Sequence, residues 1–111
     1  MKVFISQPMS GKTEQEVREA RAAAEKFLKE KFGDELELID STYDPGFKED
    51  EVKHFSAMCL AYSLTKMAEA DLVYFCYGWQ DARGCVIEHE VCEKYGIDYL
   101  PVSPIVDLEE K

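Results

Sequence analysis

Residues 72–76 read LVYFC, a continuous apolar run that organises the interpretation of the whole chain. A run of this kind, without the alternation of a half-exposed strand, is typical of a central strand in a parallel sheet that is buried on both faces. Parallel strands need long crossover connections, which are usually helices. We therefore predict an α/β fold built around the strand Leu72–Cys76.

The rest of the chain supplies the strands and helices that this fold requires. Further strands are predicted at residues 3–5, 36–39 and 98–102, and helices at residues 13–33, 49–70 and 83–95. This alternation predicts a single-domain Rossmann or flavodoxin-like sandwich, in which helices cover both faces of a four-stranded, mainly parallel sheet. The domain is expected to span residues 1–104, followed by a charged tail at residues 105–111.

Local signals mark the ends of the predicted helices. Thr13 and Glu16 have the spacing of a capping box at the start of the first helix, and Gly33 and Gly96 follow the first and third helices as stop signals. The second helix is expected to be broken near Ser56. Its residues 57–64 are apolar nearly all round, which predicts burial on both sides through a subunit interface.

The overall charge excludes several classes of partner. The chain has 111 residues and a formal net charge of −10, whereas nucleic acid polymers and anionic membranes are bound by basic surfaces. No apolar run approaches the roughly 20 residues that span a bilayer. We expect a cytoplasmic protein with no membrane partner and no nucleic acid partner.

The cysteines are expected to be reduced thiols in the core. Four of them occur without a C-x-x-C pair, and most lie in apolar surroundings. Cys85, His89 and Cys92 are spaced like ligands on one side of a helix, but no fourth ligand is evident near them and zinc sites are usually spaced differently. We therefore expect no metal site.

Three loops are expected at the sheet edge where folds of this kind bind ligands. They are SQPMSGK at 6–12, DSTYDPG at 40–46 and YGWQDARG at 77–84. The first loop leads into GKT, like the P-loop G-x-x-x-x-G-K-[ST]. However, Ser6 stands where that pattern has its first glycine, and Pro8 removes a backbone N–H from the loop. A P-loop NTPase is therefore the least favoured function.

One carboxylate lies on the side of the third helix that is expected to face the core. On a helical wheel, Glu88 falls inside the apolar stripe formed by Ile87, Val91 and Tyr95. Its side chain tilts toward Gly84, which has no side chain to block a ligand, and the helix dipole favours the ionised form. Such a carboxylate either acts as a nucleophile at a sugar carbon or is an inward acid paired with Arg83 or Lys12.

The residues around Glu88 resemble those of the nucleoside 2-deoxyribosyltransferase superfamily, which includes the nucleoside-monophosphate N-glycosidases. GCVIE at 84–88 is similar to its G-[TS]-x-x-E segment, with ADLVYF at 70–75 and HEVCEKYGI at 89–97 matching the strand before it and the helix after it. VFISQPMSG at 3–11 looks like its first strand and substrate loop. A small branch of the superfamily in phages and bacteria has a similar GW…RGC…EHE stretch.

The resemblance implies that Glu88 is a nucleophile. It would attack C1′ of the (deoxy)ribosyl group of a nucleoside or nucleoside monophosphate, and a second base or water would then take the sugar. Gly84 and Cys85 would border the sugar. No cofactor is implied.

The same resemblance suggests where the rest of the substrate binds. The pocket would be lined by Ser6, Pro8, Met9 and Ser10. A 5′-phosphate would be received at the start of the first helix by Ser10, the Gly11 amide and Lys12. The remaining substrate-binding candidates are Asp71, at the start of the central strand, and Tyr77 and Trp79, which either stack on the base or pack at the rim of the pocket.

One position departs from the pattern of the superfamily. Its members usually carry an Asp in the second helix that helps to protonate the leaving base, and Ser63 occupies that place here. Asp81 either takes over this catalytic role or is a solvated turn residue. Arg83 either binds substrate or neutralises Glu88.

Two functions therefore remain open. The first is an N-ribosyl hydrolase or transferase, and the second is a non-catalytic nucleotide-binding protein that kept the pocket. In either case we expect a homo-oligomer, a dimer or larger.

Overall fold

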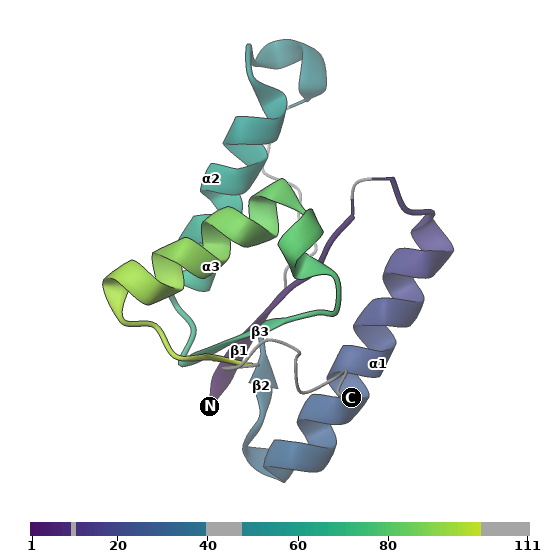
Figure 1. Cartoon of the computed structure of the whole chain (residues 1–111), viewed down its shortest axis with the longest axis vertical. Coiled ribbons are helices and arrows are strands. Elements are labelled where there is room, and N and C mark those ends of the chain that lie inside the picture. The colour runs from purple at the N-terminus through teal and green to yellow at the C-terminus, as the bar shows by residue number, and fades with distance from the viewer. Residues whose placement is uncertain (10, 40–47, 101–111) are drawn as a thin grey trace.

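The computed structural model describes residues 1–9, 11–39 and 48–100. Its strands and helices are, in chain order, β1 (Lys2–Ser6), α1 (Glu14–Phe32), β2 (Glu37–Leu38), α2 (Phe55–Met67), β3 (Leu72–Phe75), α3 (Arg83–Tyr95) and β4 (Tyr99–Leu100). Short 3₁₀ turns lie at Gly33–Glu35, Glu49–Glu51 and Trp79–Asp81. The described chain forms the predicted single-domain Rossmann-like α/β fold (Figure 1).

The sheet has four strands in the order β2-β1-β3-β4, and each neighbouring pair is parallel. The two central strands pair from Val3 with Leu72 to Ser6 with Phe75. Helix α1 covers one face of the sheet, and α2 and α3 lie together over the other (Figure 1). The predicted central strand Leu72–Cys76 is confirmed as β3, one residue shorter.

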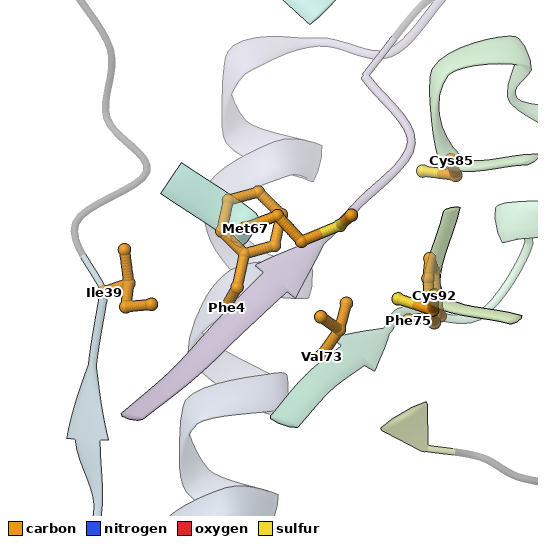
Figure 2. Close-up of a cluster of buried hydrophobic side chains, with 7 residues drawn as sticks. All are labelled: Phe4, Ile39, Met67, Val73, Phe75, Cys85 and Cys92. Atoms are coloured by element: carbon orange, nitrogen blue, oxygen red, sulfur yellow. The ribbon is translucent and has the colours of Figure 1, made fainter. Parts of the chain in front are cut away.

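Side chains of the central strands alternate between two cores. The core under α1 consists of Val3, Ile5, Ala24, Leu28, Leu72 and Cys76. The core under α2 and α3 consists of Phe4, Ile39, Met67, Val73, Phe75, Cys85 and Cys92 (Figure 2). Because successive side chains of a strand point to opposite faces, Ser6 shares the face of Phe4 and is directed to the side of α2 and α3.

The predicted ends of α1 and α3 are confirmed. The Glu16 N–H donates to Thr13 Oγ1 at 3.0 Å, and the Thr13 N–H donates to Glu16 Oε1 at 2.9 Å, which completes the capping box. Gly33 and Gly96 follow the two helices with φ of +66° and +73°, a conformation in which a side chain would be strained.

The predicted start of the second helix is wrong. A helix was expected from about residue 49 with a break near Ser56, whereas α2 begins at Phe55 and residues 49–51 form a separate 3₁₀ turn. Residues 49–54 read EDEVKH, so a helix there would have only Val52 to pack on the rest of the domain. Helical spacing continues through these charged residues, but they provide no apolar face that could pack on the domain and stabilise a helix.

The predicted buried face of α3 is also wrong in part. Tyr95 is 79% exposed and Ile87 is 38% exposed, whereas the buried residues of the helix are Cys85, Glu88 and Cys92. The wheel assigned the inward face to the largest apolar side chains. In the structure the inward positions carry two small thiols together with the predicted inward carboxylate.

Some predictions fall outside the described residues. These are the second loop at 40–46, the tail at 105–111, Ser10, and the last two residues predicted for the fourth strand. Within the described residues, β2 and β4 each comprise two residues of the predicted strands. Among the helices described, none has the combination of length and apolar character that crossing a bilayer demands.

The capping box gives the first testable prediction. Thr13→Ala removes the acceptor of the Glu16 N–H and should lower the free energy of unfolding by about 1 kcal/mol, the usual contribution of an N-cap side chain. Urea denaturation followed by circular dichroism measures this loss. Thr13→Ser keeps the acceptor and is the matched control; equal midpoints for all three proteins would contradict the role of the cap.

Candidate functional site

Glu88 is a buried carboxylate with a hydroxyl donor on each oxygen. It is 6% exposed. Ser6 Oγ donates to Glu88 Oε1 at 2.5 Å, and Ser63 Oγ donates to Glu88 Oε2 at 2.7 Å. Burying an ionisable group is costly unless it is hydrogen-bonded or paired, so these two contacts explain how an acid is tolerated on the inward face of α3.

The two serines come from different parts of the fold. Ser6 is the last residue of β1 and is 2% exposed, and Ser63 lies in α2. Glu88 therefore sits where β1, α2 and α3 meet, at the carboxyl end of a central strand. This is the edge at which open parallel α/β sheets bind their ligands.

A cavity of about 440 Å³ adjoins Glu88. This volume lies within the usual range for sites that bind small molecules. Its lining residues are Phe4, Ile5, Ser6, Gln7, Pro8, Met9, Ser56, Cys59, Leu60, Ser63, Asp81, Ala82, Arg83, Gly84, Cys85 and Glu88. A Cβ added at Gly84 would meet only Leu60 Cδ1, at 3.9 Å, so the glycine relieves no clash there and simply leaves space one turn from Glu88.

The environment of Glu88 shifts its ionisation toward the neutral form. Burial raises the pKa of Glu88 above its ordinary value of 4.5, and the hydrogen bonds from Ser6 and Ser63 oppose this rise without cancelling it. The sequence predicted that the helix dipole would favour the ionised form. The rise in the pKa of Glu88 runs against that expectation, because loss of solvent is its largest cause.

Cys85 borders the same cavity as an unreactive thiol. Burial raises the pKa of Cys85 to about 11, a hydrogen bond with Ser6 acts in the opposite direction, and the charge of Glu88 adds to the rise. A thiol with such a pKa is protonated at neutral pH and is a poor nucleophile. Glu88 is therefore the better candidate for the reactive group at this site.

The chain matches a family model over residues 1–100, described as a domain of unknown function, DUF4406. It belongs to this family. The match spans every strand and helix that builds the Glu88 cavity. Comparisons with curated proteins and with solved structures gave no match. The chemistry of this DUF4406 domain therefore has to be argued from the geometry of its own site.

Most of the predicted site residues meet at the cavity. They are Ser6, Pro8, Met9, Asp81, Arg83, Gly84, Cys85 and Glu88. Asp81 and Arg83 are exposed, whereas Pro8 and Cys85 are buried. Within the described residues, neither Arg83 nor Lys12 forms an ion pair with Glu88, so the interpretation of Glu88 as half of a salt bridge is wrong.

The start of α1 lies apart from the cavity. The Lys12 N–H donates to the Met9 carbonyl at 3.2 Å, and the Lys12 side chain lines a second hollow on the α1 side of Pro8. Gly11 is exposed and lines neither hollow. The Lys12 amide is thus already hydrogen-bonded and Gly11 lines neither hollow, so the phosphate subsite at Gly11 and Lys12 stays a prediction.

Three other predicted site residues do not line the cavity. Tyr77 is 86% exposed and borders the second hollow. Trp79 stacks on His89, with ring centroids 4.2 Å apart, so this face of the Trp79 ring packs against the core of the protein. The Asp71 carboxylate accepts the Lys2 N–H at 2.8 Å, at the amino end of the sheet, opposite to Glu88.

Helix α2 contributes site residues that the sequence analysis missed. Ser56, Cys59, Leu60 and Ser63 all line the cavity. Ser63 was read only as a departure from a family pattern, whereas its hydroxyl contacts Glu88 directly. The signal that could have identified this face is the pair of serines seven residues apart in a mostly apolar helix, since this spacing places both on one side.

The cysteines lie as expected for core thiols. All four are free, and Cys76, Cys85 and Cys92 are buried. His89, which was weighed as a metal ligand with Cys85 and Cys92, packs among aromatic rings. Within residues 1–9, 11–39 and 48–100, no cluster of three or more His, Cys, Asp or Glu side chains is arranged to hold a metal ion.

The raised pKa of Glu88 gives the second prediction. The folded protein binds a proton at Glu88 more tightly than the unfolded chain, so this residue lowers the free energy of unfolding as pH rises from about 4.5 through its folded pKa. Glu88→Gln removes the titration. Its stability relative to the natural protein should therefore increase with rising pH and then level off.

Urea unfolding at a series of pH values from about 4 to about 8 measures this difference, in which all other titrating groups cancel. Glu90→Gln, at an exposed position of the same helix, is the control for exchanging a glutamate of α3 for glutamine. A Glu88→Gln difference that shrinks as pH rises would show that the folded pKa is lowered instead.

Proposed function

We propose that this protein is an N-ribosyl hydrolase or transferase that acts on (deoxy)nucleosides or nucleoside monophosphates, with Glu88 as the nucleophile. The observation that carries the proposal is a buried carboxylate with a hydroxyl donor on each oxygen, bordering a cavity of about 440 Å³. The resemblance of residues 84–88 to the nucleoside 2-deoxyribosyltransferase superfamily supports the same nucleophile.

In the first step of the proposed reaction, a Glu88 carboxylate oxygen attacks C1′ of the sugar. A C–O ester bond forms, the C1′–N bond breaks, and its electron pair leaves with the base, which takes up a proton. Binding of the sugar beside Gly84 fits this step, since no side chain there separates a ligand from Glu88. Covalent catalysis of this kind replaces one difficult displacement by two easier ones.

In the second step, a water molecule or the nitrogen of another base attacks C1′. The new C1′–O or C1′–N bond forms, the incoming group loses a proton, and the ester bond breaks to restore the Glu88 carboxylate. Asp81, exposed at the cavity, is the candidate for exchanging protons with the base, and Arg83 for a polar contact with substrate.

One observation favours a second candidate function, the binding of a nucleotide without catalysis. Ser63 stands where the resembled superfamily carries an acid, and burial raises the pKa of Glu88, which lowers the fraction of nucleophilic carboxylate. A protein of this kind would bind ligand in the Glu88 cavity and release no base.

The third prediction separates the two functions. Incubation with millimolar deoxynucleosides and their monophosphates should release free base, detected by chromatography, and Glu88→Ala should reduce the rate at least about a thousandfold because the nucleophile is lost. The rate should rise with pH through the pKa of Glu88, since the carboxylate form is the one that attacks.

Glu90→Ala, at an exposed position of α3, is the matched control and should keep full activity. Circular dichroism establishes that each variant is folded. Equal turnover by the Glu88→Ala protein would remove this residue from the mechanism. Tight binding of a nucleotide in calorimetry without release of base would select the binding function.

The fourth prediction concerns association of the chain with itself. The only buried residue of α2 is Met67, although the helix is mostly apolar, and Met58 remains 43% exposed. We propose a cytoplasmic homo-oligomer in which a second copy covers this helix. Light scattering should give a dimer or larger, Met58→Lys should shift it toward monomer, and a monomeric mass at all concentrations would exclude the assembly.

A further inference from the structure

Ser63, in α2, contacts the nucleophile of the proposed reaction. Its hydroxyl donates to Glu88 Oε2, while Ser6 from β1 donates to Oε1. We propose that Ser63 is a positioning residue, which orients the Glu88 carboxylate and stabilises its charge as it leaves C1′ in the second step. This inference rests on the proposed function.

The two contacts fix the plane of the carboxylate. Ser6 belongs to a buried strand and Ser63 to a helix packed beside α3, so the two donors are held by separate elements of the fold. Rotation of the carboxylate would break both hydrogen bonds. Each carboxylate oxygen keeps further lone pairs beyond its single hydroxyl donor, so the arrangement orients the group and still leaves an oxygen able to attack C1′.

The chemistry of a hydroxyl group also matters at this position. Ser63 donates a hydrogen bond without adding a charge, whereas an Asp in its place, within the same 2.7 Å contact, would set two carboxyl groups against each other. Two such groups cannot both ionise easily, and the pKa of one of them rises strongly. Ser63 therefore keeps Glu88 as the single acid at the inner end of the cavity.

The size of the effect follows from the strength of the contact. A hydrogen bond to a charged group contributes more than one between neutral groups, and its loss should raise the pKa of Glu88 by about one pH unit. Among the described residues, the hydrogen bonds to Glu88 come from Ser6 and Ser63, so no second donor of α2 compensates for the lost one. Burial meanwhile continues to favour the neutral form. The carboxylate should then be scarcer at neutral pH and also a poorer leaving group.

The experiment compares four variants of the full chain. Ser63→Ala removes the hydroxyl, Ser63→Thr keeps it, and Ser63→Asp replaces it with an acid. Thr65→Ala is the matched control, because it deletes a hydroxyl of the same helix that bonds only to the Tyr62 carbonyl. The titration of the Glu88 carboxyl is followed by carbon NMR, with its resonance identified by its absence from the Glu88→Gln protein.

We expect Ser63→Ala to shift the Glu88 titration upward by about one pH unit, and to move the acidic limb of the pH–rate profile by the same amount with little change in KM. Ser63→Thr keeps the hydroxyl and should match the natural protein in both the Glu88 titration and the pH–rate profile. Thr65→Ala should also leave both unchanged. Ser63→Asp should shift the titration further. An unshifted titration in Ser63→Ala, or a tenfold gain in base release by Ser63→Asp, would overturn the inference.

Failure of this inference can be told apart from failure of the proposed function. If the natural protein releases base but the Ser63→Ala titration and pH profile do not move, the function stands and the role of Ser63 is rejected. If no nucleoside or nucleotide loses its base, the function is rejected. The NMR titration then still establishes or rejects the electrostatic effect of Ser63 on Glu88.

Discussion

A carboxyl group inside a protein has to exchange its hydration shell for hydrogen bonds, and in this domain two serines provide them. Ser6 is contributed by β1 and Ser63 by α2, while Glu88 itself belongs to α3. None of the three elements could hold the carboxylate alone. The site therefore forms only when the central strand and both helices of one sheet face have packed together, so the stability of that face and the geometry of the candidate site depend on the same contacts.

The parallel sheet explains why the contacts form at this position. Side chains alternate along β1, so the strand that sends Val3 and Ile5 toward α1 directs Phe4 and Ser6 toward α2 and α3. Ser6 is also the last residue of the strand, where the core ends and the first loop begins. The polar residue thus occupies the boundary between packed core and cavity. The small thiol of Cys85 lies on the buried side of α3 at this edge.

The sequence predicted the fold well because its signals are local. The run Leu72–Phe75, the Thr13–Glu16 capping box and the stop at Gly96 depend on neighbouring residues, and each is found in the structure. Predictions failed where packing between elements decides. The true inward face of α3 and the contact of Ser63 with Glu88 depend on how two helices lie against each other.

The burial of Glu88 has one effect on its ionisation and an opposite effect in the proposed reaction. Loss of solvent raises the pKa of Glu88 and favours the neutral acid. During cleavage of an N-glycosidic bond, positive charge develops at the sugar carbon, and a carboxylate is attracted to it more strongly in a dry site than in water. A substrate that develops this charge would therefore favour the ionised form that burial alone disfavours. In the proposed reaction, the two serine hydroxyls would reduce the cost of ionisation before that charge appears, and again when the carboxylate is released.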